Sequence, residues 1–258
     1  MRCLVASFCV VGLLPAQNQE RPPHTMLFDG VSLAGWRGDP AVWKVKDGCL
    51  VGSTVGVDIA ANTFLVLDGK EPGDFEFYAE VRLEGDNNSG VQYRSRELPG
   101  GGFKVNGYQC DLHPAANYTA MLYDEGGAGI VAQRGQAVAW RDAGREALGG
   151  VAAVKAVDLS TWHTLRIVAC GDVVWHELDG KVVTVVRDER KDAPRRGVLA
   201  LQVHRGPAMT VAFRKLALRE FPNRDAMAAH VPLPLAYSAL LKAQEQKPAA
   251  SGPVPQWL

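Results

Sequence analysis

The feature that most limits the fold of this chain is a series of short segments with alternating polarity between residues 27 and 221. From Phe75 to Leu83 every second residue is apolar, which is typical of a strand with one face in a core. Asp47-Gly48 and Asp179-Gly180 separate pairs of such segments and favour the positive backbone angles of two-residue hairpin turns. No segment keeps a helical apolar period for long. The pattern predicts an all-β fold, a jelly-roll β-sandwich of two antiparallel sheets.

The two ends of the chain differ from this region. Residues 1–16 combine a basic start, an apolar run and a small residue at a cleavage point, which predicts a signal peptide and export to the periplasm or the extracellular space. The apolar run is shorter than the roughly 20 residues that a membrane-spanning helix needs, so no membrane span is expected.

Residues 17–25 are interpreted as a linker, residues 26–221 as the jelly-roll domain and residues 222–258 as a Pro-rich C-terminal tail. A short helix interrupted by Pro232 and Pro234 is expected in this tail, which is interpreted as mobile or loosely docked.

Composition excludes several classes of protein. The 28 Lys and Arg residues balance the 28 Asp and Glu residues, so no overall field attracts nucleic acid, which is not an expected partner. Removal of the signal peptide would leave Cys49, Cys110 and Cys170, an odd number that allows at most one disulfide. Stability must then come from a hydrophobic core rather than a disulfide framework.

Polar and aromatic side chains are concentrated between residues 87 and 125, and none of the common metalloprotease, nucleophile-elbow or phosphate-loop motifs is present. Because alternate residues of a strand share a face, Gln109 and Asp111 are expected together, and Tyr93 points away from Gln92 and Arg94. Carboxylate, amide and guanidinium groups pair with sugar hydroxyls, and aromatic rings pack against the C–H surface of a pyranose. The pattern therefore indicates a carbohydrate as partner.

Each of these residues also has a purely structural interpretation. Arg94 and Asp111 could form a buried ion pair. His113 and Glu125 could be solvated loop residues, and His204 lies at a turn after a strand. The residues alone leave both interpretations open.

A set of motifs resembles one family in order along the chain. The segment from Leu27 to Trp36 is similar to the opening LFDGxSLxGW motif of the bacterial 3-keto-disaccharide hydrolase domain family. The similarity continues through residues 43–48, 74–76, 88–94, 107–111, 122–125, 162–164, 178–180, 201–204 and 211–216. The resemblance implies a concanavalin A-like jelly roll, export, and cleavage of glycosides already oxidised at C3. One common form of the family has Glu in a GxExQ motif, whereas this chain has Gln109 and Asp111 and looks like the subgroup with GYQxD.

The resemblance implies a hydrolase or lyase whose reaction begins at C2 of the sugar. A ketone at C3 acidifies the C2 proton, so the glycosidic bond can break by elimination, followed by hydration. We expect Asp111 as the base or a metal ligand, and Glu125 or His113 as the acid. The residues expected to bind the enolate, the hydroxyls or other parts of the substrate are Arg94, Gln109, Tyr93, Gln92, Tyr123 and His204. A divalent cation could polarise the carbonyl instead of Arg94, and the sequence leaves this cofactor open.

Two functions without catalysis remain as alternatives. Jelly rolls also serve lectins, so the chain could be a non-catalytic carbohydrate-binding module. Binding of an intact glycan without turnover of a keto sugar would favour that function. The Pro-rich tail from Lys247 is the one feature that suggests an interaction domain of the cell envelope.

Overall fold

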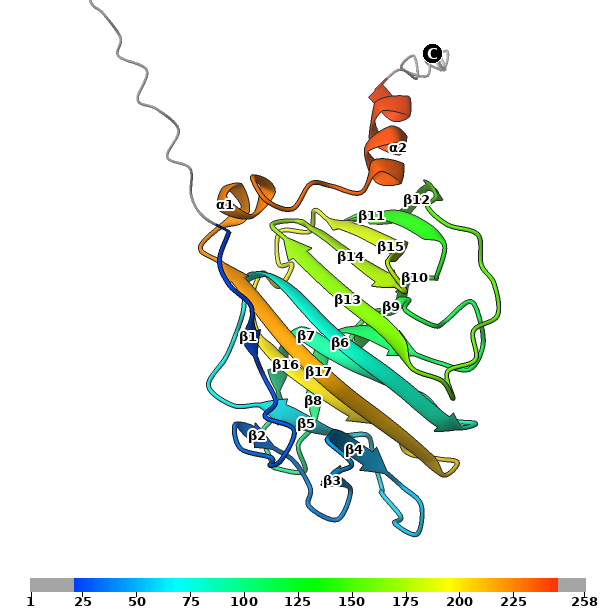
Figure 1. Ribbon diagram of the computed structural model, residues 1–258. Helices are drawn as coiled ribbons and strands as arrows, with labels where there is room; N and C mark the ends of the chain where they lie inside the picture. Colours follow the sequence, from blue (N-terminus) through cyan, green and yellow to red (C-terminus); the bar gives the residue numbers. More distant parts are fainter. Residues whose placement is uncertain (1–20, 246–258) are drawn as a thin grey trace, which may run out of the picture.

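The computed structural model describes residues 21–245, which form two layered β-sheets (Figure 1). One sheet has ten strands in the order β12-β11-β15-β14-β13-β6-β17-β4-β3, with β1 also paired to β17. These strands are β1 (Thr25–Met26), β3 (Trp43–Lys46), β4 (Cys49–Ser53), β6 (Asp74–Gly85), β11 (Gln136–Arg141), β12 (Gly144–Gly150), β13 (His163–Cys170), β14 (Val173–Leu178), β15 (Lys181–Asp188) and β17 (Met209–Phe221).

The other sheet has seven strands in the order β10-β9-β8-β7-β16-β5-β2. They are β2 (Trp36–Arg37), β5 (Thr63–Leu67), β7 (Ser89–Glu97), β8 (Val105–Leu112), β9 (Leu122–Glu125), β10 (Gly129–Ala132) and β16 (Val198–Val203). The predicted jelly-roll sandwich is confirmed, with one difference in the pairing. Strands β11 and β15 pair in parallel, whereas the expectation was two antiparallel sheets.

The turn dipeptides form the hairpins that the sequence predicts. Asp47 and Gly48 have φ angles of 51° and 69° between β3 and β4, and Asp179 and Gly180 have φ angles of 50° and 71° between β14 and β15. Two successive positive φ angles match the right-handed twist of the flanking strands. Local sequence therefore sets the register of both hairpins.

The main core lies between the two sheets. The predicted alternation along β6 is confirmed, because Phe75, Phe77 and the apolar residues at every second position to Leu83 are all buried there. The seven-stranded sheet contributes Tyr93 and Leu201 to the same cluster. Since neighbouring side chains of a regular strand point to opposite faces, Gln92 and Gln202 face away from the core, on the outer side of the seven-stranded sheet.

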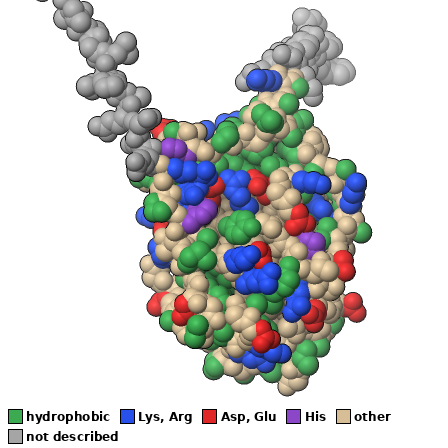
Figure 2. All heavy atoms as spheres, viewed as in Figure 1, with side chains coloured by type: hydrophobic (Ala, Val, Ile, Leu, Met, Phe, Trp, Pro, Cys, Tyr) green, Lys and Arg blue, Asp and Glu red, His purple; other side chains and the backbone are tan. Residues whose placement is uncertain are grey.

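The described part of the C-terminal tail is docked, which differs from the expected loose appendage. Helices α1 (Arg224–Ala228) and α2 (Leu235–Glu245) lie against the ten-stranded sheet (Figure 1). Met227 and Tyr237 are completely buried in a second apolar cluster, on the outer face of this sheet, with Trp175. Figure 2 shows hydrophobic side chains gathered below α2, and charged side chains of both signs over the rest of this face.

The predicted signal peptide and the Pro-rich segment from Lys247 lie outside the described residues. Between residues 21 and 245 no helix has the length and apolar character needed to cross a membrane. Cys49, Cys110 and Cys170 are all buried free thiols.

Candidate functional site

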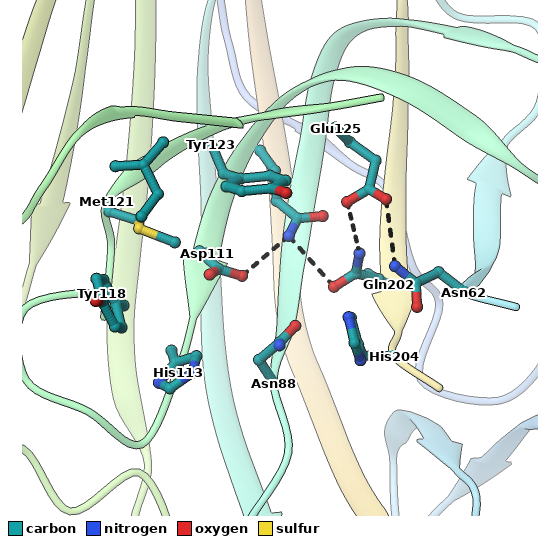
Figure 3. A pocket seen from close by; sticks show the side chains of 12 residues that line it. Asn62, Asn88, Asp111, His113, Tyr118, Met121, Tyr123, Glu125, Gln202 and His204 are labelled. Atoms are coloured by element: carbon teal, nitrogen blue, oxygen red, sulfur yellow. Dashed lines mark hydrogen bonds between the residues drawn. The ribbon is translucent and has the colours of Figure 1, made fainter. Parts of the chain in front are cut away.

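A cavity of about 320 Å³ opens on the outer face of the seven-stranded sheet. Strand β8 places Gln109 and Asp111 in its floor because Tyr108, Cys110 and Leu112 point into the core. The other lining residues come from β9, β10, β16 and nearby loops: Asn62, Asn88, His113, Tyr118, Met121, Tyr123, Glu125, Ile130, Gln202 and His204 (Figure 3). The cavity thus combines two carboxylates, amides, two imidazoles and two tyrosine rings.

A chain of side-chain amides connects the two carboxylates. Gln109 donates from Nε2 to Oδ1 of Asp111 at 2.9 Å and to Oε1 of Gln202 at 3.2 Å. Gln202 donates in turn to Oε2 of Glu125 at 3.3 Å, and Asn62 donates to Oε1 of Glu125 at 3.2 Å (Figure 3). Both carboxylates are therefore held in place by amides, and among residues 21–245 neither forms an ion pair with a Lys or Arg side chain.

Burial gives these carboxylates unusual proton affinities. Asp111 is 4% exposed, and burial, assisted by the charge of Glu125, raises the pKa of Asp111 to about 7 despite the hydrogen bond from Gln109. Burial also raises the pKa of Glu125, although Asn62 and Gln202 oppose the shift. Buried carboxyl groups with raised pKa values are suited to general acid and base catalysis.

The two histidines present different ring atoms to the cavity. The backbone N–H of Ala115 donates to Nδ1 of His113 at 2.9 Å, so the neutral His113 ring carries its proton on Nε2. His204 donates from Nδ1 to the carbonyl oxygen of Arg205 at 2.6 Å, so Nε2 of the neutral ring is an acceptor. Burial lowers the pKa of His113, which favours this neutral form. His113 is therefore a hydrogen-bond donor and His204 an acceptor.

Arg94 does not line this cavity, which corrects the expected role. It has a φ angle of 47° at an irregularity in the pairing of β7 with β8, so the strict alternation with Gln92 ends there. The guanidinium group lies 2% exposed and donates to the carbonyl oxygens of Gly73 at 3.0 Å and Gly171 at 2.8 Å. Its carboxylate partner is Asp74, at 3.3 Å, and not Asp111. Arg94 ties loops of the other sheet to β7.

Tyr93 and Gln92 also lie outside the cavity. The Tyr93 ring is buried between the sheets, where its hydroxyl pairs with Nε2 of His176 at 2.8 Å, so it cannot contact a substrate on the outer face. Gln92 is on the outer face but fully buried behind Gln109, to which it donates at 2.9 Å. Of the nine residues expected at the site, the structure brings together Gln109, Asp111, His113, Tyr123, Glu125 and His204.

Sequence reasoning missed several lining residues. Gln202 offered a signal, because it is the one polar side chain in the apolar strand from Val198 to Val203. Asn62, Met121 and Ile130 offered none, because they lie next to loops and reach the cavity only through long-range strand pairing.

The cavity does not contain a compact set of metal ligands. Among residues 21–245, no group of three or more His, Cys, Asp or Glu side chains is placed to hold a metal ion. Gln109 donates to Oδ1 of Asp111 and Gln202 donates to Oε2 of Glu125. The divalent cation that the sequence left open stays an untested expectation.

Comparison with known proteins gives one family and several similar folds. Residues 23–219 match the family model described as a 3-keto-alpha-glucoside-1,2-lyase-like domain. No curated protein matches the chain.

Among solved structures, a candidate glycosyl hydrolase from Parabacteroides distasonis ATCC 8503 has a TM-score of 0.53 at 19% identity, covering 77% of this chain and 94% of that chain. The carbohydrate binding module CBM66 from Bacillus subtilis has a TM-score of 0.52 at 16% identity, covering 72% of this chain and 96% of its own. A Bacillus subtilis protein with a galectin-like fold has a TM-score of 0.51 at 11% identity, covering 73% and 90%. At these identities the likeness concerns the fold.

Proposed function

Because the chain belongs to the 3-keto-alpha-glucoside-1,2-lyase-like domain family, a family of carbohydrate-active proteins, we propose that it cleaves 3-keto-glycosides in the cavity on the seven-stranded sheet. The observation that carries this proposal is the pair Asp111 and Glu125, two buried carboxyl groups with raised pKa values in one cavity. The proposal includes export, because residues 1–16 have the pattern of a signal peptide.

Asp111 acts as the base in the first step. It removes the proton from C2, and the electron pair of that C–H bond is delocalised onto the oxygen at C3 as an enolate. A carboxylate whose pKa is about 7 is ionised in a large fraction of molecules at neutral pH and accepts a proton readily. Both N–H groups of Gln109 are already used by Asp111 and Gln202, so the enolate oxygen takes its hydrogen bond from Nε2–H of His113.

Two buried carboxyl groups in one cavity titrate as a pair, and the active form of this pair holds one proton, on Glu125, while Asp111 is ionised. Glu125 therefore acts as the acid in the second step. The enolate collapses to a C1–C2 double bond, the C1–O bond breaks, and the departing oxygen takes a proton from Glu125. Water then adds to C1 and gives its other proton to Glu125, while Asp111 returns its proton to C2. Both carboxyl groups regain their starting states, and the net reaction is hydrolysis of the glycoside.

The test compares two substrates that differ only at C3. The purified protein should release the aglycone from a 3-keto-glucoside and leave the unoxidised glucoside intact, because only the ketone acidifies C2. Asp111→Asn should lower kcat by about a hundredfold or more if Asp111 is the base, while circular dichroism shows a folded protein. If folded Asp111→Asn turns over the 3-keto-glucoside at an unchanged rate, Asp111 is not the base. Calorimetric binding of an intact glycan without any turnover would favour the carbohydrate-binding module instead.

A further inference from the structure

A second hollow, of about 340 Å³, adjoins the proposed catalytic cavity. The two share the side chains of Asn62, Glu125 and His204 as a common wall. A molecule that occupies the first cavity can therefore extend past Glu125 into the second. The proposed reaction assigns no ligand to this second hollow.

The direction of the proposed reaction indicates which part of the substrate would lie there, so this step rests on the proposed function. Asp111 and His113 lie on one side of the cavity, and Glu125 and Asn62 lie on the other (Figure 3). If Asp111 takes the proton from C2 and Glu125 protonates the departing oxygen, the sugar ring lies over Asp111 and the aglycone projects beyond Glu125. The second hollow begins at that point.

The lining of the second hollow indicates the chemistry of such an aglycone. Ala60 and Leu98 contribute apolar surface, and Lys104 and Arg205 contribute two exposed cations. Arg205 donates from one guanidinium nitrogen to the carbonyl oxygen of Ala60 at 3.4 Å. Neither cation pairs with a carboxylate among residues 21–245, so both charges are available to an anionic ligand. Apolar walls with unpaired cations fit an aromatic group that carries a carboxylate.

A third hollow of about 360 Å³ also borders Glu125, and its charge differs. Its charged lining residues are Arg94, Arg96, Arg196, Asp124, Glu125 and Asp192, so cations and carboxylates balance there. In the second hollow Glu125 is the one lining carboxylate beside the two cations Lys104 and Arg205, so positive charge is in excess there. This difference selects the second hollow over the third for an anionic group.

The backbone of the rim next to Lys104 is tied to the seven-stranded sheet. Phe103, which precedes Lys104, has a φ angle of 49°, and its carbonyl oxygen accepts a hydrogen bond from the backbone N–H of Phe64 at 3.0 Å. A bulky residue with positive φ costs roughly 1–3 kcal/mol and persists where surrounding contacts enforce it, often at ligand sites. The loop is thus anchored to β5 at the residue before the cation.

We propose that the second hollow is the leaving-group subsite and that it favours glycosides with an aromatic, carboxylate-bearing aglycone. Lys104 and Arg205 determine this preference by pairing with the carboxylate. The backbone of Arg205 contacts Asn62 and His204, and these contacts remain when its side chain is changed. The side chains of Lys104 and Arg205 make no hydrogen bond to Asp111, Glu125, Gln109 or Gln202, so we assign them to selectivity rather than the chemical step.

The first experiment measures binding, which does not depend on turnover. Calorimetry compares 4-carboxyphenyl glucoside with its neutral isostere, 4-carbamoylphenyl glucoside, in both anomeric forms. The unaltered protein should bind the carboxylate about tenfold more tightly, in line with two exposed ion pairs, and added salt should reduce this preference. The double variant Lys104→Gln, Arg205→Gln should lose the preference and keep its affinity for the neutral isostere. Arg96→Gln, in the third hollow, is the matched control and should behave like the unaltered protein.

Three results would overturn the proposal: equal affinities in the unaltered protein, a preference that survives in the double variant, or no detectable binding of either glucoside. Turnover of the 3-keto forms of the same two compounds then tests the proposed reaction separately from the proposed subsite. If the protein binds the carboxylate more tightly but turns over neither keto compound, the proposed reaction is wrong and the proposed subsite stands. If the protein turns over the keto compounds but does not bind the carboxylate more tightly than the neutral isostere, the proposed subsite is wrong and the proposed reaction stands.

Discussion

At the scale of single residues, Asp111 shows how burial creates a reactive group. The carboxyl group lies at the floor of the cavity with an amide as its nearest partner, and the cavity supplies no cation to stabilise its charge. The cost of holding the ionised form out of water raises its pKa from an ordinary 3.8 to about 7. The same cost must reduce the stability of the folded protein.

Asp111→Asn should therefore stabilise the protein, and more so at high pH. Between pH 3.8 and about 7 the unfolded chain ionises this group while the folded chain does not, so stability falls as pH rises, and the loss is complete above about pH 7. The variant should gain up to about 4 kcal/mol in free energy of unfolding at pH 8 and little at pH 3. Urea unfolding at both pH values measures the difference. An equal gain at the two pH values would show that Asp111 does not titrate as described.

Glu125→Gln should distinguish good from poor leaving groups. An amide cannot donate the proton that an alkoxide needs, whereas a nitrophenolate departs without help. We expect kcat for a 3-keto alkyl glucoside to fall at least a hundredfold, and kcat for the 3-keto 4-nitrophenyl glucoside to fall much less. Steady-state rates for both substrates give the comparison. Equal losses would show that Glu125 has a role other than acid catalysis.

At the scale of elements, one glycine allows three strands to build the cavity floor. Gly90 of β7 lies directly opposite Asp111 of β8 on one side and Gln202 of β16 on the other. With no side chain at Gly90, the amide of Gln109 lies across this position and contacts both neighbours. A β-carbon at Gly90 would come within 2.6 Å of Cγ and Cδ of Gln109.

Gly90→Ala should therefore disturb the amide chain. The added β-carbon meets the Gln109 side chain and, at 2.9 Å, the backbone carbonyl oxygen of Cys110, so the Gln109 amide moves away and β8 shifts slightly, which leaves Asp111 and Gln202 unconnected. Circular dichroism checks that the variant is folded. We expect kcat/KM for the 3-keto-glucoside to fall about tenfold or more, because the base loses its orienting hydrogen bond. Gly150→Ala in β12 is the control, since its β-carbon would make only ordinary contacts. A folded Gly90→Ala protein with full activity would show that the bridge is dispensable.

At the scale of the whole molecule, the outer faces of the two sheets have different roles. The seven-stranded sheet carries the cavity on its outer face, and the ten-stranded sheet is covered on its outer face by α1 and α2. The main core separates these surfaces. A change beneath the helices should consequently affect stability and not the cavity.

Met227→Ala tests this division. Met227 is a fully buried residue of α1, so truncation of its side chain should lower the free energy of unfolding by about 3 kcal/mol. The rate on a 3-keto-glucoside should stay unchanged at temperatures where the variant is folded. Met26→Ala is the control, because that side chain is 59% exposed and should contribute little. A drop in activity that parallels the loss of stability would show that the two faces are coupled.

The local sequence pattern predicted much of the fold, because strand alternation and hairpin turns depend on residues that are close together along the chain. Alternation along β6 identified the buried face, Asp179-Gly180 identified a hairpin, and alternation along β8 placed Gln109 beside Asp111. The same rule failed at Arg94, where a positive φ angle interrupts the strand, and no residue type at that position indicates it.

The sequence by itself determined the strands, the hairpins and the family, because each depends on residues close together along the chain. Only the tertiary structure decided that Glu125 meets Gln202 and Asn62, that Arg94 binds loops of the opposite sheet, and that the helices dock. Those contacts join residues far apart in sequence. Strand periodicity specifies which way a side chain points and does not specify which distant strand lies beside it.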